Sequence, residues 1–189
     1  MKVIVVGGGP AGIMAAISAA SNGANVVLLE KNSSLGKKLL ITGKGRCNLT
    51  NDCDAQEFLN NVVTNSKFMI SSVYGFPPSA TIELFESLGL CLKTERGNRV
   101  FPVSDKAVDI VDALVNTAKA VGVKIINAPA TAVLTENGGV TGVKLLSGEV
   151  LPADSILVAT GGVSYPVTGS TGDGYRIAKT LGHSVSEIS

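Results

Sequence analysis

Three glycines near the start of the chain have the spacing that diphosphate-binding turns use. Gly7, Gly9 and Gly12 form a G-x-G-x-x-G pattern between an apolar run and an alanine-rich segment. The pattern lets the backbone turn tightly, so that bare N–H groups at the positive end of a helix can meet a pyrophosphate. We therefore predict a strand, a turn and a helix in succession, with Pro10 and Ala11 also beside a bound dinucleotide.

An acidic residue follows at the distance expected of a ribose-binding carboxylate. Residues 25–30 form a second apolar run that ends in Glu30, about 20 residues beyond the glycine pattern. A carboxylate at this place accepts hydrogen bonds from the adenosine ribose and repels a 2′-phosphate, so NADP is disfavoured. The alternative for the glycine pattern is an ordinary turn in a β-α-β unit.

The bulk composition is that of a folded domain without a charge excess. Of the 189 residues, 45% are hydrophobic and 16% are charged, with 16 basic and 15 acidic side chains. This balance favours neither nucleic acid nor a membrane as a partner, and no apolar run approaches the roughly 20 residues that cross a bilayer. Three cysteines and one histidine support neither a disulfide framework nor a metal site, and we expect a cytoplasmic protein.

The remaining hydrophobic periods predict strands and helices interrupted by one long loop. Residues 31–51 carry glycines but no helical or strand period, and long ordered loops are usually functional. Parallel strands are predicted at 123–126 and 155–159, with the turn chemistry of an antiparallel meander between them. The other predicted elements are helices at 55–63, 79–88, 105–121 and 175–181, a hairpin at 92–95 and 99–103, and meander strands at 131–135, 140–146 and 149–151.

Taken in order along the chain, these features resemble the FAD domain of the glutathione-reductase-like flavoproteins. Three motifs narrow the resemblance to the aminoacetone oxidase-like family, which includes bile-acid dehydro reductases: Thr42–Asn51, Arg99–Pro102 and Ser164–Gly174. The resemblance implies an α/β fold, namely a Rossmann-like FAD-binding domain with a parallel sheet, flanking helices and an antiparallel β-meander crossover. It also implies that FAD is the cofactor.

The resemblance extends the expected cofactor site beyond the opening turn. The loop after Glu30 runs along the cofactor in this family, and Thr160 and Gly161 end a parallel strand at its carboxyl edge, where α/β sheets bind ligands. The start of the last helix is expected to face the flavin and to stabilise negative charge on it. The candidate cofactor-binding residues are Gly7, Gly9, Pro10, Ala11, Gly12, Glu30, Lys31, Gly36, Lys38, Thr42, Gly45, Arg46, Cys47, Asn48, Ala132, Val133, Thr160, Gly161, Gly172 and Asp173.

Several of these residues have a purely structural alternative. Arg46 offers donors to phosphate or flavin oxygens, or is a solvated loop residue. Ala132 and Val133 lie beside the adenine, or only pack within their strand. Asp173 is expected more as the N-cap of the last helix than as a ligand. Cys47 is expected to be a small side chain packed near the cofactor, because its spacing to the next cysteine does not match the dithiol of disulfide reductases.

The expected domain organisation follows from the resemblance. Residues 1–165 should form the N-terminal part of the FAD-binding domain, and residues 166–189 a flavin-side loop and helix that lead to a second domain. Because members of this family are longer chains, we expect an N-terminal fragment that binds FAD weakly and has weak or no activity.

The expected activity of the parent protein is a flavin-mediated two-electron oxidation or reduction of a small organic substrate. NAD(P)H is one candidate electron donor, and no catalytic residue is assigned. The alternatives are a non-catalytic dinucleotide-binding module and an NAD-dependent dehydrogenase.

Overall fold

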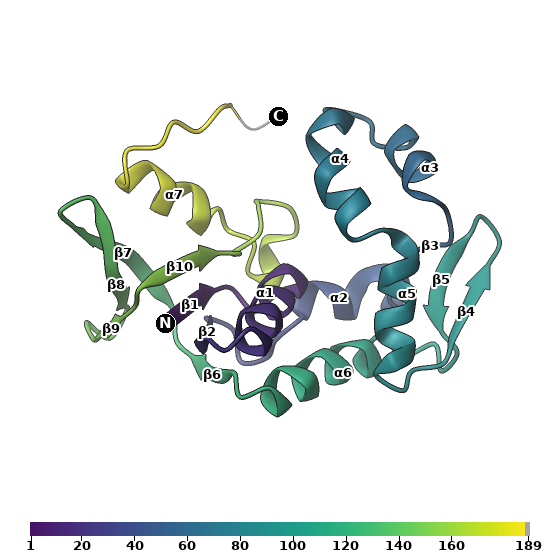
Figure 1. Ribbon diagram of the computed structural model, residues 1–189, viewed down its shortest axis with the longest axis horizontal. Coiled ribbons are helices and arrows are strands. Elements are labelled where there is room, and N and C mark those ends of the chain that lie inside the picture. Colours follow the sequence, from purple (N-terminus) through teal and green to yellow (C-terminus); the bar gives the residue numbers. More distant parts are fainter. Residues whose placement is uncertain (188–189) are drawn as a thin grey trace. The chain divides into compact units, whose positions relative to one another are not determined.

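The chain folds into two compact units (Figure 1). The structure is a computed structural model and describes residues 1–187. The first unit comprises Met1–Lys38 and the chain from Leu114 onward, and the second comprises Leu39–Ala113. The first unit thus contains both the opening glycine turn and the last helix. The domain limit expected at residue 165 stays a prediction, and the last two residues of the predicted segment 166–189 lie outside the described residues.

A parallel sheet of four strands forms the centre of the first unit. Its order is β10-β1-β2-β6, so the two apolar runs at the start of the sequence become its two middle strands. The register of β1 and β2 places Ile4 opposite Val27 and Val6 opposite Leu29. The strands are β1 (Lys2–Val6), β2 (Asn25–Glu30), β6 (Lys124–Asn127) and β10 (Ser155–Val158).

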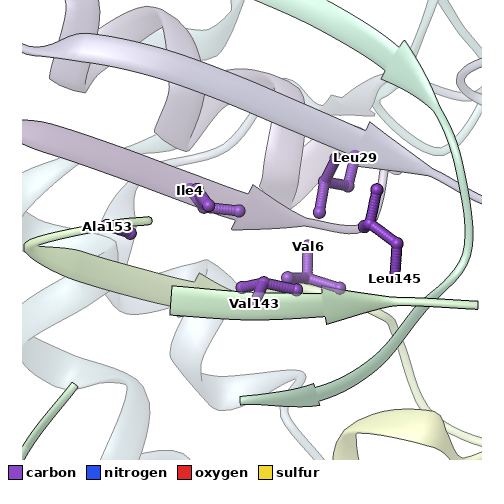
Figure 2. Close-up of a cluster of buried hydrophobic side chains, with 6 residues drawn as sticks. All are labelled: Ile4, Val6, Leu29, Val143, Leu145 and Ala153. Carbon is purple, nitrogen blue, oxygen red and sulfur yellow. The ribbon is translucent and has the colours of Figure 1, made fainter. Parts of the chain in front are cut away.

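An antiparallel meander packs against one face of the parallel sheet. Its strands are β7 (Ala130–Glu136), β8 (Gly139–Leu145) and β9 (Val150–Pro152), in that order. Figure 2 shows the buried cluster between them, which consists of Ile4, Val6, Leu29, Val143, Leu145 and Ala153. Full burial of each larger aliphatic side chain contributes about 1.5–3 kcal/mol, so this cluster holds the meander on the sheet.

Helix α1 (Pro10–Ser21) covers the other face. It contacts β1, β2 and β10. Successive side chains of a strand point to opposite faces, so Val5 and Leu28, both fully buried, lie on the face away from the meander. The last helix of this unit is α7 (Asp173–Thr180), which contacts β7 and follows the short 3-10 helix η2 (Pro166–Thr168).

The second unit contains a small antiparallel sheet and several helices. The sheet order is β3-β5-β4, and β4 and β5 form the predicted hairpin. Its elements are the 3-10 helix η1 (Thr42–Gly45), β3 (Thr50–Asn51), α3 (Ala55–Asn60), α4 (Ser66–Gly75), α5 (Pro78–Ser87), β4 (Leu92–Glu95) and β5 (Arg99–Pro102). The division between the units falls within α2 (Lys37–Ile41) and α6 (Ala107–Ala120).

The predicted α/β fold with a parallel sheet, flanking helices and a meander is confirmed. The prediction that residues 31–51 lack helix and strand is wrong, because they contain α2, η1 and β3. No side chain of α2 or η1 is buried, so no apolar period marks either element in the sequence. Helix α4 was also missed, and Val73 is its one buried residue.

Candidate functional site

The glycine turn joins β1 to α1 and lies against the end of β10. Gly7 has a φ of +110°, which L residues rarely adopt. Its N–H donates to the Leu29 carbonyl at 2.8 Å. A Cβ atom at Gly7 would lie 2.4 Å from the carbonyl oxygen of Ala159, the residue after β10. Only glycine allows the turn to pass this close to the neighbouring strand.

Helix α1 begins at this turn with no side chain over its N-terminus. Gly9 is the N-cap in an extended conformation, Pro10 is the first helical residue, and no side chain makes a capping hydrogen bond. The first N–H groups of a helix lack partners within the helix and carry partial positive charge. A Cβ atom at Gly9 would meet nothing within 4 Å. The turn therefore leaves open space in which an anionic group can approach these N–H groups.

The Glu30 carboxylate lies beside the turn and is fixed by three hydrogen bonds. Its Oε2 accepts from the Gly8 N–H at 2.7 Å. Its Oε1 accepts from the backbone N–H of Asn32 at 2.7 Å and from Asn32 Nδ2 at 2.6 Å. A carboxylate has about four lone-pair sites, so one site of Oε2 remains for a hydroxyl of a ligand. Glu30 is 9% exposed. Its three hydrogen bonds hold the carboxylate in place in the ligand-free protein.

Asn32 links this carboxylate to the β10–α7 loop, which we define as residues 159–172. Its Nδ2 also donates to the Thr168 carbonyl at 3.3 Å. Gly169, with a φ of +101°, passes so close that a Cβ atom there would lie 2.5 Å from Asn32 Nδ2. Sequence reasoning missed Asn32, although its position two residues after Glu30 was an available signal. Asn32 is a positioning residue for the carboxylate.

Two lysines hold the β10–α7 loop and the start of α7. Lys31 Nζ donates to Thr171 Oγ1 and to Asp173 Oδ2, both at 2.7 Å. Lys38 Nζ donates to the Ser164 carbonyl at 2.8 Å. Burial acts to raise the pKa of Asp173, but the hydrogen bond and charge of Lys31 outweigh it, so this pKa lies below its ordinary value. Asp173 is therefore ionised at neutral pH and paired with Lys31.

Replacing Lys31 by methionine should lower the stability of the ligand-free protein by up to about 1 kcal/mol at neutral pH. Because the pKa of Asp173 is depressed in the folded protein, the ion pair adds stability above the ordinary carboxyl pKa and loses it as the pH falls through the folded value. The difference between wild type and Lys31→Met in urea unfolding should therefore stay constant from pH 7 down to the ordinary carboxyl pKa of about 4 and shrink below it. Lys31→Arg, which keeps the charge, is the control, and a difference independent of pH contradicts the assignment.

These elements surround a cavity of about 700 Å³ in the first unit. Its walls are the glycine turn, the end of β2 with the loop after it, the end of β10, the β10–α7 loop and the start of α7. Parallel strands end at one edge of a sheet, which is why segments distant in sequence meet there. The candidate residues that line the cavity are Gly7, Gly9, Pro10, Ala11, Glu30, Lys31, Gly36, Lys38, Thr160, Gly161 and Asp173.

Comparison with known families decides the relationship. The family model described as the HI0933-like protein Rossmann domain matches residues 1–189. The chain belongs to the HI0933-like family. The expected relationship to bile-acid reductases is confirmed as well, because one relative is a "3-dehydro-bile acid delta(4,6)-reductase" from Clostridium scindens. It is 36% identical over 197 residues, which cover 99% of this chain and 45% of the relative.

A second relative of the HI0933-like chain has a different printed function. It is a "Ribosomal RNA dihydrouridine synthase" from Escherichia coli, 30% identical over 184 residues, which cover 96% of this chain and 44% of the relative. The chain thus spans about half the length of the curated relatives it matches. Among solved structures, the open conformation of a flavocytochrome c3 fumarate reductase matches with a TM-score of 0.69 and 25% identity, over 97% of this chain and 40% of that one.

The family match and the similarity to a flavocytochrome identify FAD as the cofactor, which confirms the prediction from the sequence. The residues around the cavity fit such a group. The bare face of Gly9 and the uncapped start of α1 suit a pyrophosphate, and the fixed Glu30 carboxylate suits a ribose hydroxyl. The assignment of individual residues to parts of FAD stays a prediction.

The other candidate residues of this HI0933-like chain lie apart from the cavity lining. Gly12 packs α1 against the turn, since a Cβ atom there would lie 1.8 Å from the Gly7 carbonyl oxygen. Ala128 and Ala130 line the cavity near the expected adenine position. The remaining candidates do not line the cavity, and their contact with FAD, like that of the lining residues, stays a prediction: Thr42, Gly45, Arg46, Cys47 and Asn48 in the second unit, Ala132 and Val133 on β7, and Gly172 before α7.

The prediction that Asp173 caps the last helix is wrong. Gly172 is the N-cap, with a φ of +79°, and no side chain caps α7. Asp173 is the first residue of the helix, and its carboxylate lies 2.7 Å from Lys31 Nζ and 3.2 Å from Arg176 Nη2. Lys31 and Arg176 hold the Asp173 carboxylate in ion pairs. The N–H groups at the start of α7 have no side-chain cap.

Arg46 is part of a charge network in the second unit. Its Nη1 lies 2.8 Å from Glu95 Oε1 and 3.3 Å from Asp105 Oδ1, and Lys93 Nζ lies 2.7 Å from Asp105 Oδ2. The guanidinium also stacks 4.1 Å from the ring centroid of Phe101. The hydrogen bond with Glu95 is the main cause of the raised pKa of Arg46. These contacts engage donors that were expected to meet the cofactor, and the cofactor role of Arg46 stays a prediction.

Cys47 is a buried side chain with left-handed backbone, at a φ of +61°. Burial raises the pKa of its thiol, which lowers the fraction present as the reactive thiolate. The three cysteines, Cys47, Cys53 and Cys91, are all free. The packed role expected for Cys47 is confirmed, and its closeness to the cofactor stays a prediction.

The described part of the chain shows neither a membrane-spanning helix nor a metal-binding cluster. None of its helices combines the length and apolar character needed to cross a bilayer. Within residues 1–187 there is also no group of three or more histidine, cysteine, aspartate or glutamate side chains arranged to hold a metal ion.

Proposed function

We propose that the chain is the FAD-binding part of a flavin-dependent oxidoreductase. The observation that carries this proposal is the open N-terminus of α1, which is uncapped, is bare at Gly9 and shares its cavity with the Glu30 carboxylate. Dinucleotides require a positive helix end beside the diphosphate and an acceptor beside the ribose. Both groups occur here at the carboxyl edge of a parallel sheet.

Each wall of the cavity has a proposed task. The first N–H groups of α1 hold the pyrophosphate, and the free lone pair of Glu30 accepts one ribose hydroxyl. Thr160, Gly161 and the start of α7 lie toward the flavin, where the positive end of the helix stabilises negative charge. The bound FAD supplies two-electron chemistry in the form of hydride transfer, and the protein supplies position and electrostatics.

For the whole protein we propose reduction of a carbon–carbon double bond next to a carbonyl group. Two relatives support this reaction class, because their names state reduction of a 3-dehydro-bile acid and synthesis of dihydrouridine. Dihydrouridine is uridine with one ring double bond saturated. We favour a small organic substrate over RNA, since 16 basic and 15 acidic residues leave no basic excess for a polyanion. The predicted cytoplasmic location is part of this proposal.

The identity of the bound dinucleotide tests the proposal directly. The purified full-length protein should be yellow, should release FAD on denaturation as identified by mass spectrometry, and should bleach when dithionite is added without oxygen. Release of NAD instead of FAD would support an NAD-dependent dehydrogenase. Failure to bind any dinucleotide after reconstitution would exclude the hypothesis that the protein is a flavoprotein.

Anaerobic stopped-flow measurements then test the reaction. The FAD absorbance should decrease with NADH or NADPH and recover with a 4-en-3-one steroid. Recovery with oxygen alone would instead indicate an oxidase. Recovery with uridine in RNA alone would contradict the predicted absence of a nucleic-acid partner.

A further inference from the structure

Ser170 is a buried polar residue without a role in the proposed function. It lies in the β10–α7 loop and is 6% exposed; with Glu30 it is one of the two buried polar or charged residues of the described chain. It also lines the cavity of the first unit. Burial of a hydroxyl is unfavourable unless the group is hydrogen-bonded, so a buried serine on a cavity wall requires an explanation.

The Ser170 hydroxyl has no hydrogen-bond partner among residues 1–187. Within the same residues, every side-chain nitrogen or oxygen that is fully sealed from solvent does have a partner. The hydroxyl therefore retains some accessible surface. Because Ser170 is otherwise enclosed and lines the cavity, we take that surface to open into the cavity.

Two neighbouring hydroxyls of the same loop contrast with Ser170. Thr168 Oγ1 donates to the Tyr165 carbonyl at 2.8 Å, and Thr171 Oγ1 accepts from Lys31 Nζ at 2.7 Å. These groups are satisfied without a ligand. Ser170 is the buried hydroxyl of this loop, and its hydrogen-bonding capacity remains available to a molecule in the cavity.

The backbone around Ser170 makes room for its hydroxyl. Gly161, three residues after β10, has a φ of +73°, and a Cβ atom there would lie 3.0 Å from Ser170 Oγ. A side chain at position 161 would thus crowd the hydroxyl as well as strain the backbone. Gly161 was expected to contact the cofactor, and its geometry gives it a second role, which is to leave space for Ser170.

We propose that Ser170 is a cofactor-binding residue whose hydroxyl hydrogen-bonds an oxygen of the bound dinucleotide. This inference rests on the proposed FAD function and adds a contact from the β10–α7 loop, on a segment separate from the glycine turn. The hydroxyl both donates and accepts, so phosphate, ribose and ribityl oxygens are suitable partners. The loop thereby recognises the ligand directly.

Ser170→Ala tests the proposal through two quantities that move independently. The flavin-free variant should have an unchanged or higher Tm, because an unsatisfied buried hydroxyl is replaced by a methyl group. Its Kd for FAD, measured by quenching of flavin fluorescence, should rise about 10-fold, since one hydrogen bond to the dinucleotide is lost. Ser170→Thr retains the hydroxyl and should remain closer to wild type in Kd.

The matched control is Ser71→Ala, which removes the hydroxyl of an exposed serine on α4 and should leave the Kd for FAD unchanged, with at most a slightly higher Tm because alanine favours helix. ADP serves as a second probe. Weaker ADP binding by Ser170→Ala would place the contact on the adenosine diphosphate half, and unchanged ADP binding with weaker FAD binding would place it on the flavin half. Both results support the proposal.

Two results would overturn it. One is an FAD affinity of Ser170→Ala equal to that of wild type. The other is a fall in the Tm of the flavin-free protein that accounts for the weaker binding, because the hydroxyl would then be structural. Wild-type protein without FAD affinity would instead refute the proposed function itself, so the two failures are distinguishable.

Discussion

Gly9→Asp should raise the stability of the flavin-free protein and greatly weaken its binding of FAD. Gly9 is the N-cap of α1, has a φ of −77° and a ψ of 178°, and has open space where a side chain would start. Aspartate is among the preferred N-cap residues, and its charge interacts favourably with the helix dipole. We expect a gain of about 0.5 kcal/mol, visible as a higher Tm of the flavin-free protein.

The same substitution should weaken binding of the FAD pyrophosphate. An N-cap carboxylate accepts hydrogen bonds from the second or third helical N–H, and these are the groups proposed to hold the phosphates. Two like charges about 4 Å apart repel by about 4 kcal/mol at the effective dielectric constant of a protein surface. FAD affinity should therefore fall by more than about 100-fold.

Gly9→Asn separates the effect of the N-cap hydrogen bond from the effect of the negative charge. It should give a comparable gain in Tm, because asparagine caps helices as well as aspartate does. Its loss of FAD affinity should be smaller than that of Gly9→Asp, since only steric and hydrogen-bond competition remain. Unchanged FAD binding by Gly9→Asp would exclude this turn as the pyrophosphate site.

The parts of the fold that follow from hydrophobic period were predictable from the sequence. The run before Gly7 and the run ending at Glu30 are buried on both faces, and they form the two central strands of the parallel sheet. The meander was predictable because glycine-containing turns separate three short runs, and the strands lie within about two residues of the predicted ranges. Helices with at most one buried side chain, such as α2 and α4, were missed.

The candidate site was predictable where a backbone requirement fixes the residue type. Gly7 and Gly9 follow from the turn and from the approach of a ligand, and Glu30 follows from its place at the end of β2. Asn32 and Ser170 were missed because their roles arise from tertiary contacts. Asn32 gains its role from a carboxylate two residues away, and Ser170 from a loop more than a hundred residues along the chain.

Gly12→Ala should destabilise the flavin-free protein by about 3 kcal/mol, although the same exchange in an ordinary helix stabilises it. A Cβ atom at Gly12 would lie 1.8 Å from the carbonyl oxygen of Gly7 and 3.3 Å from Ala159 Cβ. The nearer atom belongs to the backbone, which cannot rotate away as a side chain can. Helix α1 would have to move away from the turn, and the sheet face that it covers would lose part of its packing.

Gly9→Ala is the matched control, because it adds the same methyl group three residues earlier in the same motif. A Cβ atom at Gly9 meets nothing within 4 Å, so the free energy of unfolding should remain within about 0.5 kcal/mol of wild type. Urea unfolding of both flavin-free variants measures the contrast. A Gly12→Ala variant as stable as Gly9→Ala would show that α1 does not depend on close contact with the turn. The expected contrast would instead establish that Gly12 is a packing position of the glycine motif and that Gly9 has room for a side chain.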